Sequence, residues 1–413
     1  MSMHHEICEG AMDDMIEKRD HSFKQLFLQG NGLRVEWSDG HQSRFLGMWL
    51  RDNCTCEACG TTLSGQRQLS LHDFDDSIVP LGVESTPNSS IRIDWPDGHQ
   101  SEFSASWLRS HCNCEACLSR QRYRLSPWTS TLDPESLVFD AGEVMDSDDI
   151  RLAAMTRLAE IGVIRLKQLP GEKLAALAEH FGYLHDTNYG QVLDMRVESE
   201  SWFKVMSAGP IPAHTDNVYR YNPTGVSFFH CVEQIEGEGG ASYYVDGLSL
   251  AARIKELDED AHECLCTEPL VFYRHIPANA AMHVDAAYFR SEATVFKTDA
   301  QGSVIGLRYH PRTLAPMTKD DTTISRVYRA RRLLEQVSED PAFHAQFRAD
   351  LHECAIYDNH RVMHARTTFE LTKGARHFRQ CHVDREEFHS RLRLLALSRG
   401  ARIPEELLTS GLV

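Results

Sequence analysis

Apolar and polar residues alternate in two closely similar stretches near the start of the chain, each centred on an Asp-Gly turn. The stretch Leu-Arg-Val-Glu-Trp37-Ser-Asp-Gly-His41 returns as Ile-Arg-Ile-Asp-Trp95-Pro-Asp-Gly-His99, 58 residues later. Alternation on both sides of Asp-Gly is typical of a β-hairpin. The constant offset indicates an internal duplication inside a small β domain over residues 31–125. Residues 1–30 lack strong periodicity, so we expect a loose arm or a short helix there.

After residue 125 the pattern changes. Residues 126–150 are predicted to form a connector, and Ser147 with two following aspartates predicts a helix through Ala159 that ends near Gly162. A short strand and a second helix over 172–181 follow. Apolar runs then predict strands at 225–232, 241–245, 270–273, 304–309, 353–358 and 378–383, with one helix near 321–338. This pattern favours a mainly β fold with helices (α+β), a double-stranded β-helix or jelly roll over 151–400, with a tail at 401–413.

Composition narrows the functional classes. The net charge of −17 over 413 residues argues against a nucleic-acid-binding surface, although a locally basic pocket for an anion stays compatible with it. No apolar run of about 18 residues is present, so no membrane span is predicted. The polar amino terminus does not resemble a signal peptide, and we expect a cytoplasmic protein. Six of the 12 cysteines form two Cys-x-Cys-x-x-Cys clusters, a spacing that favours metal ligands over disulfides in a reducing compartment.

Candidate catalytic chemistry begins at His214-Thr-Asp216, where an extended strand would place both side chains on one face. Two histidines and one carboxylate leave half of an iron coordination sphere open, as in non-heme Fe(II) oxygenases. The candidate third ligand is His364, with His360 as a rival. A lone histidine here would favour a hydrogen-bonded structural role, so the assignment depends on the partner residues. Twelve residues after His364, Arg376 offers a bidentate donor for the far carboxylate of a chelating dicarboxylate.

These motifs together resemble the γ-butyrobetaine and trimethyllysine dioxygenase family, over residues 33–395. The shared sequence motifs include Trp-Leu-Arg-Asp-Asn-Cys-x-Cys-x-x-Cys, His-Thr-Asp-Asn-x-Tyr-Arg, Val-Asp-Gly and Asp-Asn-x-Arg-x-x-His. The resemblance implies iron ligands His214, Asp216 and His364, a 2-oxoglutarate site formed by Arg376, Ser242 and Ile211, O2 as co-substrate, and a homodimer. It also implies a structural zinc bound by Cys54, Cys56, Cys59 and His99.

The duplication suggests a reciprocal cluster that the family does not supply. Cys112, Cys114 and Cys117 of the second copy would meet His41 of the first if the halves are related by pseudo-symmetry. A reduced triad without metal is the alternative.

The substrate pocket departs from the family pattern. Family members that bind quaternary ammonium groups enclose the cation in aromatic rings, by cation–π attraction. Tyr189 keeps one wall, but Leu193, Met206 and His382 stand at positions where the family has aromatic residues, and Phe203 replaces an asparagine. His382 is expected to contact a polar or less methylated group, and His310 and Arg312 to hold a carboxylate or phosphonate. Trp202, Tyr219 and Tyr221 are alternative cage residues.

The predicted activity is hydroxylation of a C–H bond in a small zwitterionic, betaine-like, amino-acid-like or phosphonate-like molecule, with succinate and CO2 as co-products. Desaturation or rearrangement of a non-quaternary substrate, and a non-catalytic scaffold stabilised by zinc, are the alternatives. A zinc hydrolase is disfavoured because Arg376 is present and no general base is evident nearby.

Overall fold

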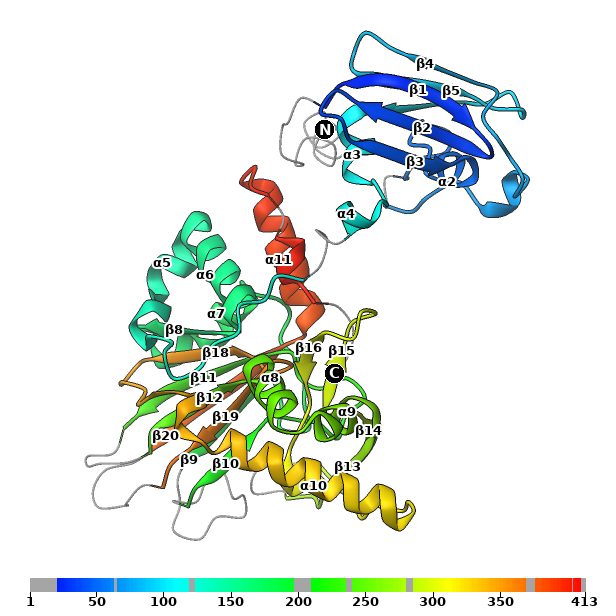
Figure 1. The fold of residues 1–413 in the computed structure, drawn as a ribbon. Helices are drawn as coiled ribbons and strands as arrows, with labels where there is room; N and C mark the ends of the chain where they lie inside the picture. Colours follow the sequence, from blue (N-terminus) through cyan, green and yellow to red (C-terminus); the bar gives the residue numbers. More distant parts are fainter. Residues whose placement is uncertain are drawn as a thin grey trace. The chain divides into compact units, whose positions relative to one another are not determined.

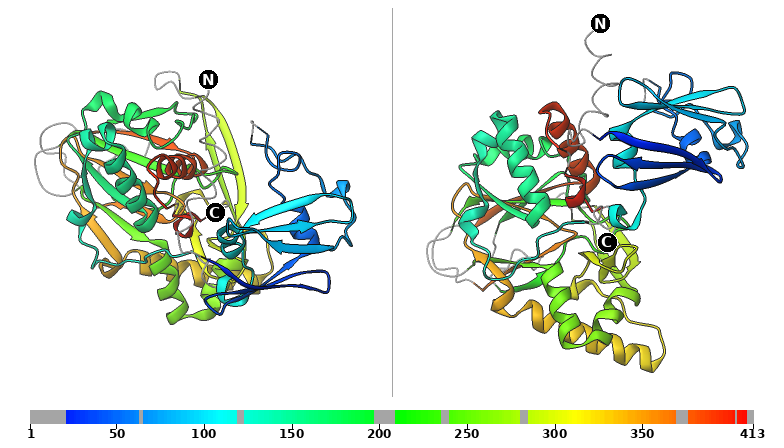
Figure 2. Two further views of the ribbon diagram at one scale, coloured as in Figure 1. Left: turned by 90° about the horizontal axis from the view of Figure 1, so that it is seen from above. Right: turned by 45° about the horizontal axis from the view of Figure 1, so that its top comes forward.

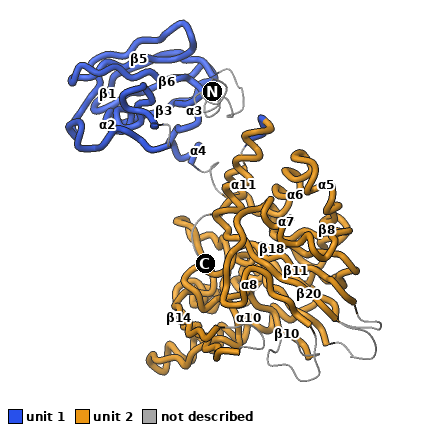
Figure 3. Tube along the Cα trace, turned by 180° about the vertical axis from the view of Figure 1, so that it is seen from behind, with its two compact units in different colours: residues 1–122, 400–402 blue, residues 123–399, 403–413 orange. Residues whose placement is uncertain are grey.

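The chain divides into two compact units, shown in different colours in Figure 3. Unit 1 comprises residues 1–122 and 400–402, and unit 2 comprises 123–399 and 403–413. The computed structural model describes residues 21–62, 65–118, 123–196, 209–234, 240–279, 285–368, 376–402 and 404–409. Among these residues, no helix combines the length and the apolar character needed to cross a membrane.

Unit 1 contains two three-stranded antiparallel sheets, one from each copy of the repeat (Figure 1). The first is β1 (Phe23–Gln29), β2 (Gly32–Trp37) and β3 (Gln42–Leu46), followed by α2 (Gly47–Asp52). The second is β4 (Gly82–Ser85), β5 (Ser90–Asp94) and β6 (Gln100–Ser104), followed by α3 (Ala105–Ser110) and α4 (Glu115–Leu118). Both Asp-Gly turns use glycine in the left-handed region, Gly40 at φ +82° and Gly98 at φ +80°, which explains the glycine at this position in both copies.

Equivalent residues of the two copies share one core. It contains Leu33, Val35, Trp37, Phe45 and Leu50 from the first copy and Ile91, Ile93, Trp95, Phe103 and Leu108 from the second. Even the polar partners of the tryptophans correspond, since the indole N–H groups donate to the Oγ atoms of Ser43 (2.8 Å) and Ser101 (2.9 Å). The expectation of a loose arm or helix over residues 1–30 is wrong for 23–29. These residues form β1, which pairs with β2, and the ring of Phe23 packs on Trp37 with centroids 5.2 Å apart.

Unit 2 is a mixed α+β fold with two larger sheets. The four-stranded sheet has the order β10 (Ile211–His214), β19 (Val362–Arg366), β12 (Ser242–Asp246) and β17 (His344–Phe347). The six-stranded sheet has the order β7 (Val138–Asp140), β8 (Val163–Lys167), β18 (Cys354–Asp358), β11 (Val226–Glu233), β20 (His377–Val383) and β9 (Val192–Arg196). Two hairpins complete it: β13 (Leu270–Ile276) with β14 (Ala287–Ala293), and β15 (Phe296–Thr298) with β16 (Val304–Leu307).

Helices cover the outer faces of the two sheets, as the views of Figure 2 show. One group packs on the six-stranded sheet: α5 (Ala141–Asp146), α6 (Asp148–Ile161), α7 (Leu174–Glu179) and α11 (Arg385–Ser398). The other packs on the four-stranded sheet and the hairpins: α8 (Gly247–Leu257), α9 (Glu259–Thr267) and α10 (Asp321–Ser338). Short 3-10 turns occur at Leu71–Asp73, Pro134–Leu137, Gly171–Lys173, Pro311–Thr313, Pro341–Phe343 and Glu405–Leu407.

Two expectations for unit 2 need correction. The β-rich part contains α8, α9 and α11 in addition to the expected helix at 321–338. Helices α8 and α11 follow the strands β12 and β20, α9 follows α8, and an aspartate occupies the N-cap position of each. The segment 126–150 is not only a connector, since β7 pairs in parallel with β8 and α5 contributes buried Ala141 and Val144 to the core.

Candidate active site

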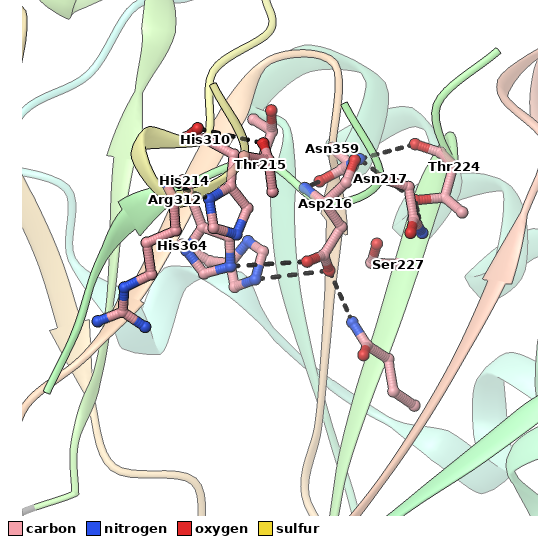
Figure 4. A network of polar contacts seen from close by, with 12 residues as sticks. His214, Thr215, Asp216, Asn217, Thr224, Ser227, His310, Arg312, Asn359 and His364 are labelled. Atoms are coloured by element: carbon pink, nitrogen blue, oxygen red, sulfur yellow. Dashed lines mark hydrogen bonds and ion pairs between the residues drawn. The ribbon is translucent and has the colours of Figure 1, made fainter. Parts of the chain in front are cut away.

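The predicted iron ligands converge at the edge of the four-stranded sheet. His214 ends β10 and is the register partner of His364 on β19, with ring centroids 4.2 Å apart. Asp216 reaches the site from the turn after β10, and its Oδ1 and Oδ2 lie 3.6 Å from His214 Nε2 and 3.5 Å from His364 Nε2 (Figure 4). From the sequence, His214 and Asp216 are expected to share one face of an extended strand. That expectation is wrong for Asp216, because the strand ends at His214. The three ligand atoms lie within 4.8 Å of one another.

Protonation states at this cluster suit a divalent cation. The Nδ1–H of His214 donates to the carbonyl oxygen of Pro212 at 2.8 Å, so Nε2 is the ring nitrogen that faces Asp216. Burial lowers the pKa of His364 to about 3, so this imidazole is neutral. Burial opposes ionisation of Asp216, but the neighbouring His364 and His214 outweigh it and hold the pKa of the carboxyl below its usual range. A neutral His364 and an ionised Asp216 suit iron, which binds deprotonated ligands.

Asp216 is fixed by two residues to which no role was assigned from the sequence: Asn359, which stands in the Asp-Asn-x-Arg motif, and Gln380. Its backbone N–H donates to Asn359 Oδ1 at 2.7 Å, and Asn359 Nδ2 donates back to the carbonyl oxygen of Asp216 at 3.0 Å. Gln380 Nε2 donates to Asp216 Oδ2 at 2.9 Å. The rival candidate His360 is buried elsewhere, with Nε2 3.2 Å from the carbonyl oxygen of Pro223, whereas His364 lies beside His214 and Asp216.

The Val-Asp-Gly and Asp-Asn-x-Arg motifs form a buried ion pair next to the ligands. Arg361 Nε donates to Asp246 Oδ1 at 2.8 Å, with exposed fractions of 1% and 0% for the two side chains. Asp246 also accepts from the backbone N–H of Ser249 and so caps α8. A Cβ at Gly247 would lie 2.7 Å from the carbonyl oxygen of Arg361, which excludes a larger residue. The pair thereby joins β12 to the turn before β19.

One cavity of about 350 Å³, lined by residues of both sheets, contains the cluster. The predicted site residues that line it are His214, Asp216, His364, Arg376, Ser242, Ile211, Tyr189, Leu193, His310, Arg312 and His382. Met206, Trp202 and Phe203 lie outside the described residues. Tyr219 also lines the cavity, whereas Tyr221 is 81% exposed and is not among its lining residues.

Arginines make one side of the cavity basic. Arg376 and Arg366 are both buried and donate through Nη2 to the carbonyl oxygens of Gly240 (3.1 Å) and Gly209 (2.7 Å). Burial, and then the charges of Arg376 and Arg312, lower the pKa of Arg366 to about 9. Burial lowers the pKa of Arg376 to about 10, so both remain cations at neutral pH. Sequence reasoning missed Arg366, although alternation along β19 places it on the same face as His364.

The rest of the lining combines neutral histidines with the aromatic residues Tyr189, Tyr219, Phe229, Tyr244, Tyr357 and Phe378. His382 Nδ1 lies 2.9 Å from Ser227 Oγ, and burial lowers the pKa of His382 to about 4. The ring of His310 lies 4.5 Å from that of His214. Arg312 Nη2 donates to the carbonyl oxygen of Pro210 at 3.2 Å. Arg274, another lining residue, carried no sequence signal that set it apart from other strand arginines.

The first cysteine cluster is also assembled, in unit 1. The Sγ atoms of Cys54, Cys56 and Cys59 lie 3.2, 3.6 and 3.6 Å from His99 Nε2. Zinc–sulfur and zinc–nitrogen bonds of about 2.3 and 2.0–2.1 Å place these atoms about 3.6 Å apart in a tetrahedral site. The four side chains therefore fit zinc.

Comparison with known proteins defines the class. Residues 123–382 match the model of the taurine catabolism dioxygenase TauD, TfdA family, and residues 25–107 and 91–142 match that of the gamma-butyrobetaine hydroxylase-like amino-terminal domain. Gamma-butyrobetaine dioxygenase of Pseudomonas sp. (strain AK-1) is 30% identical over 370 residues, which cover 88% of this chain and 94% of that protein. The human gamma-butyrobetaine dioxygenase is 27% identical, with the same coverage. Trimethyllysine dioxygenase of Meyerozyma guilliermondii is 26% identical and covers 92% of this chain and 98% of its own.

These matches define a 2-oxoglutarate-dependent dioxygenase. Within that class, the chain belongs to the family of the gamma-butyrobetaine and trimethyllysine dioxygenases.

Proposed function

We propose that this dioxygenase hydroxylates a C–H bond of a small zwitterionic substrate in the cavity between the two sheets of a jelly roll. The observation that carries the proposal is the presence of the His214, Asp216 and His364 cluster and of buried Arg376 in one cavity. Bound iron, 2-oxoglutarate and O2 supply the oxidant when present: one oxygen atom enters the substrate as an alcohol, and 2-oxoglutarate becomes succinate and CO2.

The residues of the chain hold and orient the reactants. His214, Asp216 and His364 would bind iron through Nε2, a carboxylate oxygen and Nε2, on one side of the ion. Arg376 would pair with the far carboxylate of 2-oxoglutarate, and Ser242 and Ile211, which line the same cavity, would complete its pocket. The ligands are largely buried, with His214 only 7% exposed, so bulk water has little access to them.

Two replacements in the cavity wall favour a substrate that is not a trimethylammonium compound. Leu193 and the neutral His382 stand where the family has aromatic residues and offer no π face comparable with a tyrosine ring for a cation. The aromatic residues that do line the cavity are Tyr189, Tyr219, Phe229, Tyr244, Tyr357 and Phe378. His382 suits hydrogen bonding to a polar or less methylated nitrogen, and His310 with Arg312 suits an anionic end such as a carboxylate or phosphonate. We therefore expect an amino-acid-like or phosphonate-like zwitterion to be preferred over γ-butyrobetaine and trimethyllysine, the substrates in the names of the relatives.

Succinate release tests the proposal. The iron-loaded protein is incubated with 2-oxoglutarate and a panel of zwitterions matched in length but carrying trimethylated, dimethylated or free amino groups. Succinate formation that requires iron and is abolished in Asp216→Ala is the expected result, with the free or partly methylated members most active. Product mass and labelling from isotopic dioxygen separate hydroxylation from desaturation or rearrangement. Iron-loaded protein without coupled or uncoupled turnover would refute the proposal and favour the scaffold alternative.

We also propose that Cys54, Cys56, Cys59 and His99 bind a structural zinc, supported by the fit of their four ligand atoms to a tetrahedral ion. The resemblance to the dioxygenases further leads us to expect a homodimer, which the elution volume and light scattering of the purified chain would test. A cytoplasmic location stays a prediction from the sequence.

A further inference from the structure

The second copy of the repeat carries a cysteine cluster with the geometry of the first. The Sγ atoms of Cys112, Cys114 and Cys117 lie 3.2, 3.7 and 3.7 Å from Nε2 of His41. The corresponding distances around His99 are 3.2, 3.6 and 3.6 Å. Both sets match the separation of about 3.6 Å between sulfur and nitrogen in a tetrahedral zinc site.

Hydrogen bonding does not account for this arrangement. An imidazole Nε2 has either one N–H or one lone pair and forms one good hydrogen bond. Three sulfur atoms nevertheless converge on Nε2 of His41, and all four ligand atoms lie within 4.8 Å of one another. A tetrahedral cation accounts for all of these contacts at once. The three cysteines are also free thiols, so no disulfide explains their proximity.

The surroundings of the two clusters correspond as well. The backbone N–H of His41 donates to Asp39 Oδ1 at 2.8 Å, as that of His99 donates to Asp97 Oδ1 at 3.0 Å. A guanidinium also contacts one sulfur of each cluster at 3.3 Å, from Arg109 to Cys117 and from Arg51 to Cys59. Three thiolates around a divalent cation carry one net negative charge, and an adjacent arginine stabilises that charge.

We propose that His41, Cys112, Cys114 and Cys117 form a second structural zinc site. In each site the thiolates come from one copy of the repeat and the imidazole from the other. The two ions therefore tie the halves of unit 1 together reciprocally, and loss of one ion leaves the other link in place. The second site is the more accessible, because Cys59 is buried whereas its counterpart Cys117 is only half-buried. Zinc at the second site exchanges faster with a chelator.

Zinc counting on the full chain tests the proposal. Elemental analysis compares the unmodified protein with His41→Ala, His99→Ala and the double variant. Each single variant is expected to hold one zinc fewer per chain and the double variant two fewer, and any metal in the cavity of unit 2 cancels in these differences. Cys266→Ser, a half-buried cysteine outside both clusters, is the matched control and keeps the full zinc content.

Two further measurements keep the result interpretable. Circular dichroism and thermal unfolding identify variants that lose zinc because they fail to fold, and Cys114→Ser replaces a half-buried ligand with a near-isosteric side chain. Cobalt substitution of the unmodified protein needs no variant, because the intensity of its sulfur-to-cobalt charge-transfer band reports the number of bound thiolates. Intensity for three thiolates per chain instead of six, or full zinc content in folded His41→Ala and Cys114→Ser, overturns the proposal.

Discussion

Replacing Arg376 by lysine should weaken 2-oxoglutarate binding while leaving the iron ligands in place. Arg376 is 4% exposed, and burial lowers its pKa only to about 10, so it enters the reaction as a cation. Lysine keeps the charge but loses the planar pair of N–H donors that fits a carboxylate. A hydrogen bond to a charged group contributes about 1.5–3 kcal/mol. The dissociation constant of 2-oxoglutarate should therefore rise about 10- to 150-fold.

Anaerobic titration measures this constant without knowledge of the substrate. The complex of Fe(II) with 2-oxoglutarate has a metal-to-ligand charge-transfer absorption that follows binding directly. Arg379→Lys is the matched control: it is an arginine of β20, the strand that begins directly after Arg376, its Nη1 donates to the carbonyl oxygen of Gly171 at 3.0 Å, and it is not among the cavity-lining residues. The control should bind 2-oxoglutarate normally.

The result that would refute this reasoning is an unchanged dissociation constant in Arg376→Lys. If Arg366→Lys then weakened binding instead, the far carboxylate would belong to Arg366, the other buried cation of the cavity. Arg366 also donates to Gly209 at 2.7 Å, so iron content and thermal stability of that variant must be measured alongside.

Three further predictions concern residues that support the site. Asn359→Ala should weaken iron binding about 10- to 100-fold in an anaerobic competition assay, because it removes both contacts to the backbone of Asp216. Glu353→Ala should lower the free energy of unfolding by about 3–5 kcal/mol in urea, since it leaves the buried Arg165, 2.6 Å away, unpaired on that side. Burial lowers the pKa of His230 to about 4, below the unfolded value of about 6.5. Protonation therefore favours the unfolded chain, and stability falls as pH falls through this window. His230→Gln should remove about 1 kcal/mol of the loss between pH 7.5 and 5.5.

Each of these predictions has a clear contrary outcome. Glu135→Ala removes the other carboxylate of Arg165, but that residue is 67% exposed, so its cost should stay below about 1 kcal/mol. Equal costs for the two glutamates would contradict the role of burial. Unaltered iron affinity in Asn359→Ala would show that Gln380 alone positions Asp216. An unchanged pH dependence in His230→Gln would assign the acid sensitivity to other buried histidines, such as His389.

Local sequence signals predicted the elements that are fixed locally. The helix α6 is capped at its start by Ser147, whose side chain accepts from the backbone N–H of Ile150, and at its end by Gly162, with φ +86°. The helix α10 has the predicted bounds, 321–338. The duplication was visible because both copies keep the same turn and the same alternation. In each case, residues within a few positions of one another determine the structure.

The parts that depend on distant pairing were not predictable in the same way. The strands β10 and β19 have only four and five residues, and their register, His214 opposite His364, joins positions 150 apart in the chain. No local pattern specifies such a pairing. The roles of Asn359 and Gln380 were not predicted for the same reason. Each amide side chain contacts Asp216 only because the fold brings distant segments of the chain together.

Part of the proposed substrate wall lies on a different sheet from the proposed metal ligands. The metal ligands, Ser242 and Ile211 belong to β10, β19, β12 and the turn after β10, where the buried pair of Arg361 and Asp246 holds two of these segments together. Leu193 and His382, by contrast, belong to β9 and β20 of the other sheet, and Tyr189 to the loop before β9. Within β20 it is Gln380 that donates to Asp216, whereas His382 pairs with Ser227, so replacement of Leu193 or His382 leaves the Gln380 contact to Asp216 in place. Because Leu193 and His382 lie on another sheet than the proposed iron ligands, these positions can depart from the family's aromatic residues while the proposed iron site is retained.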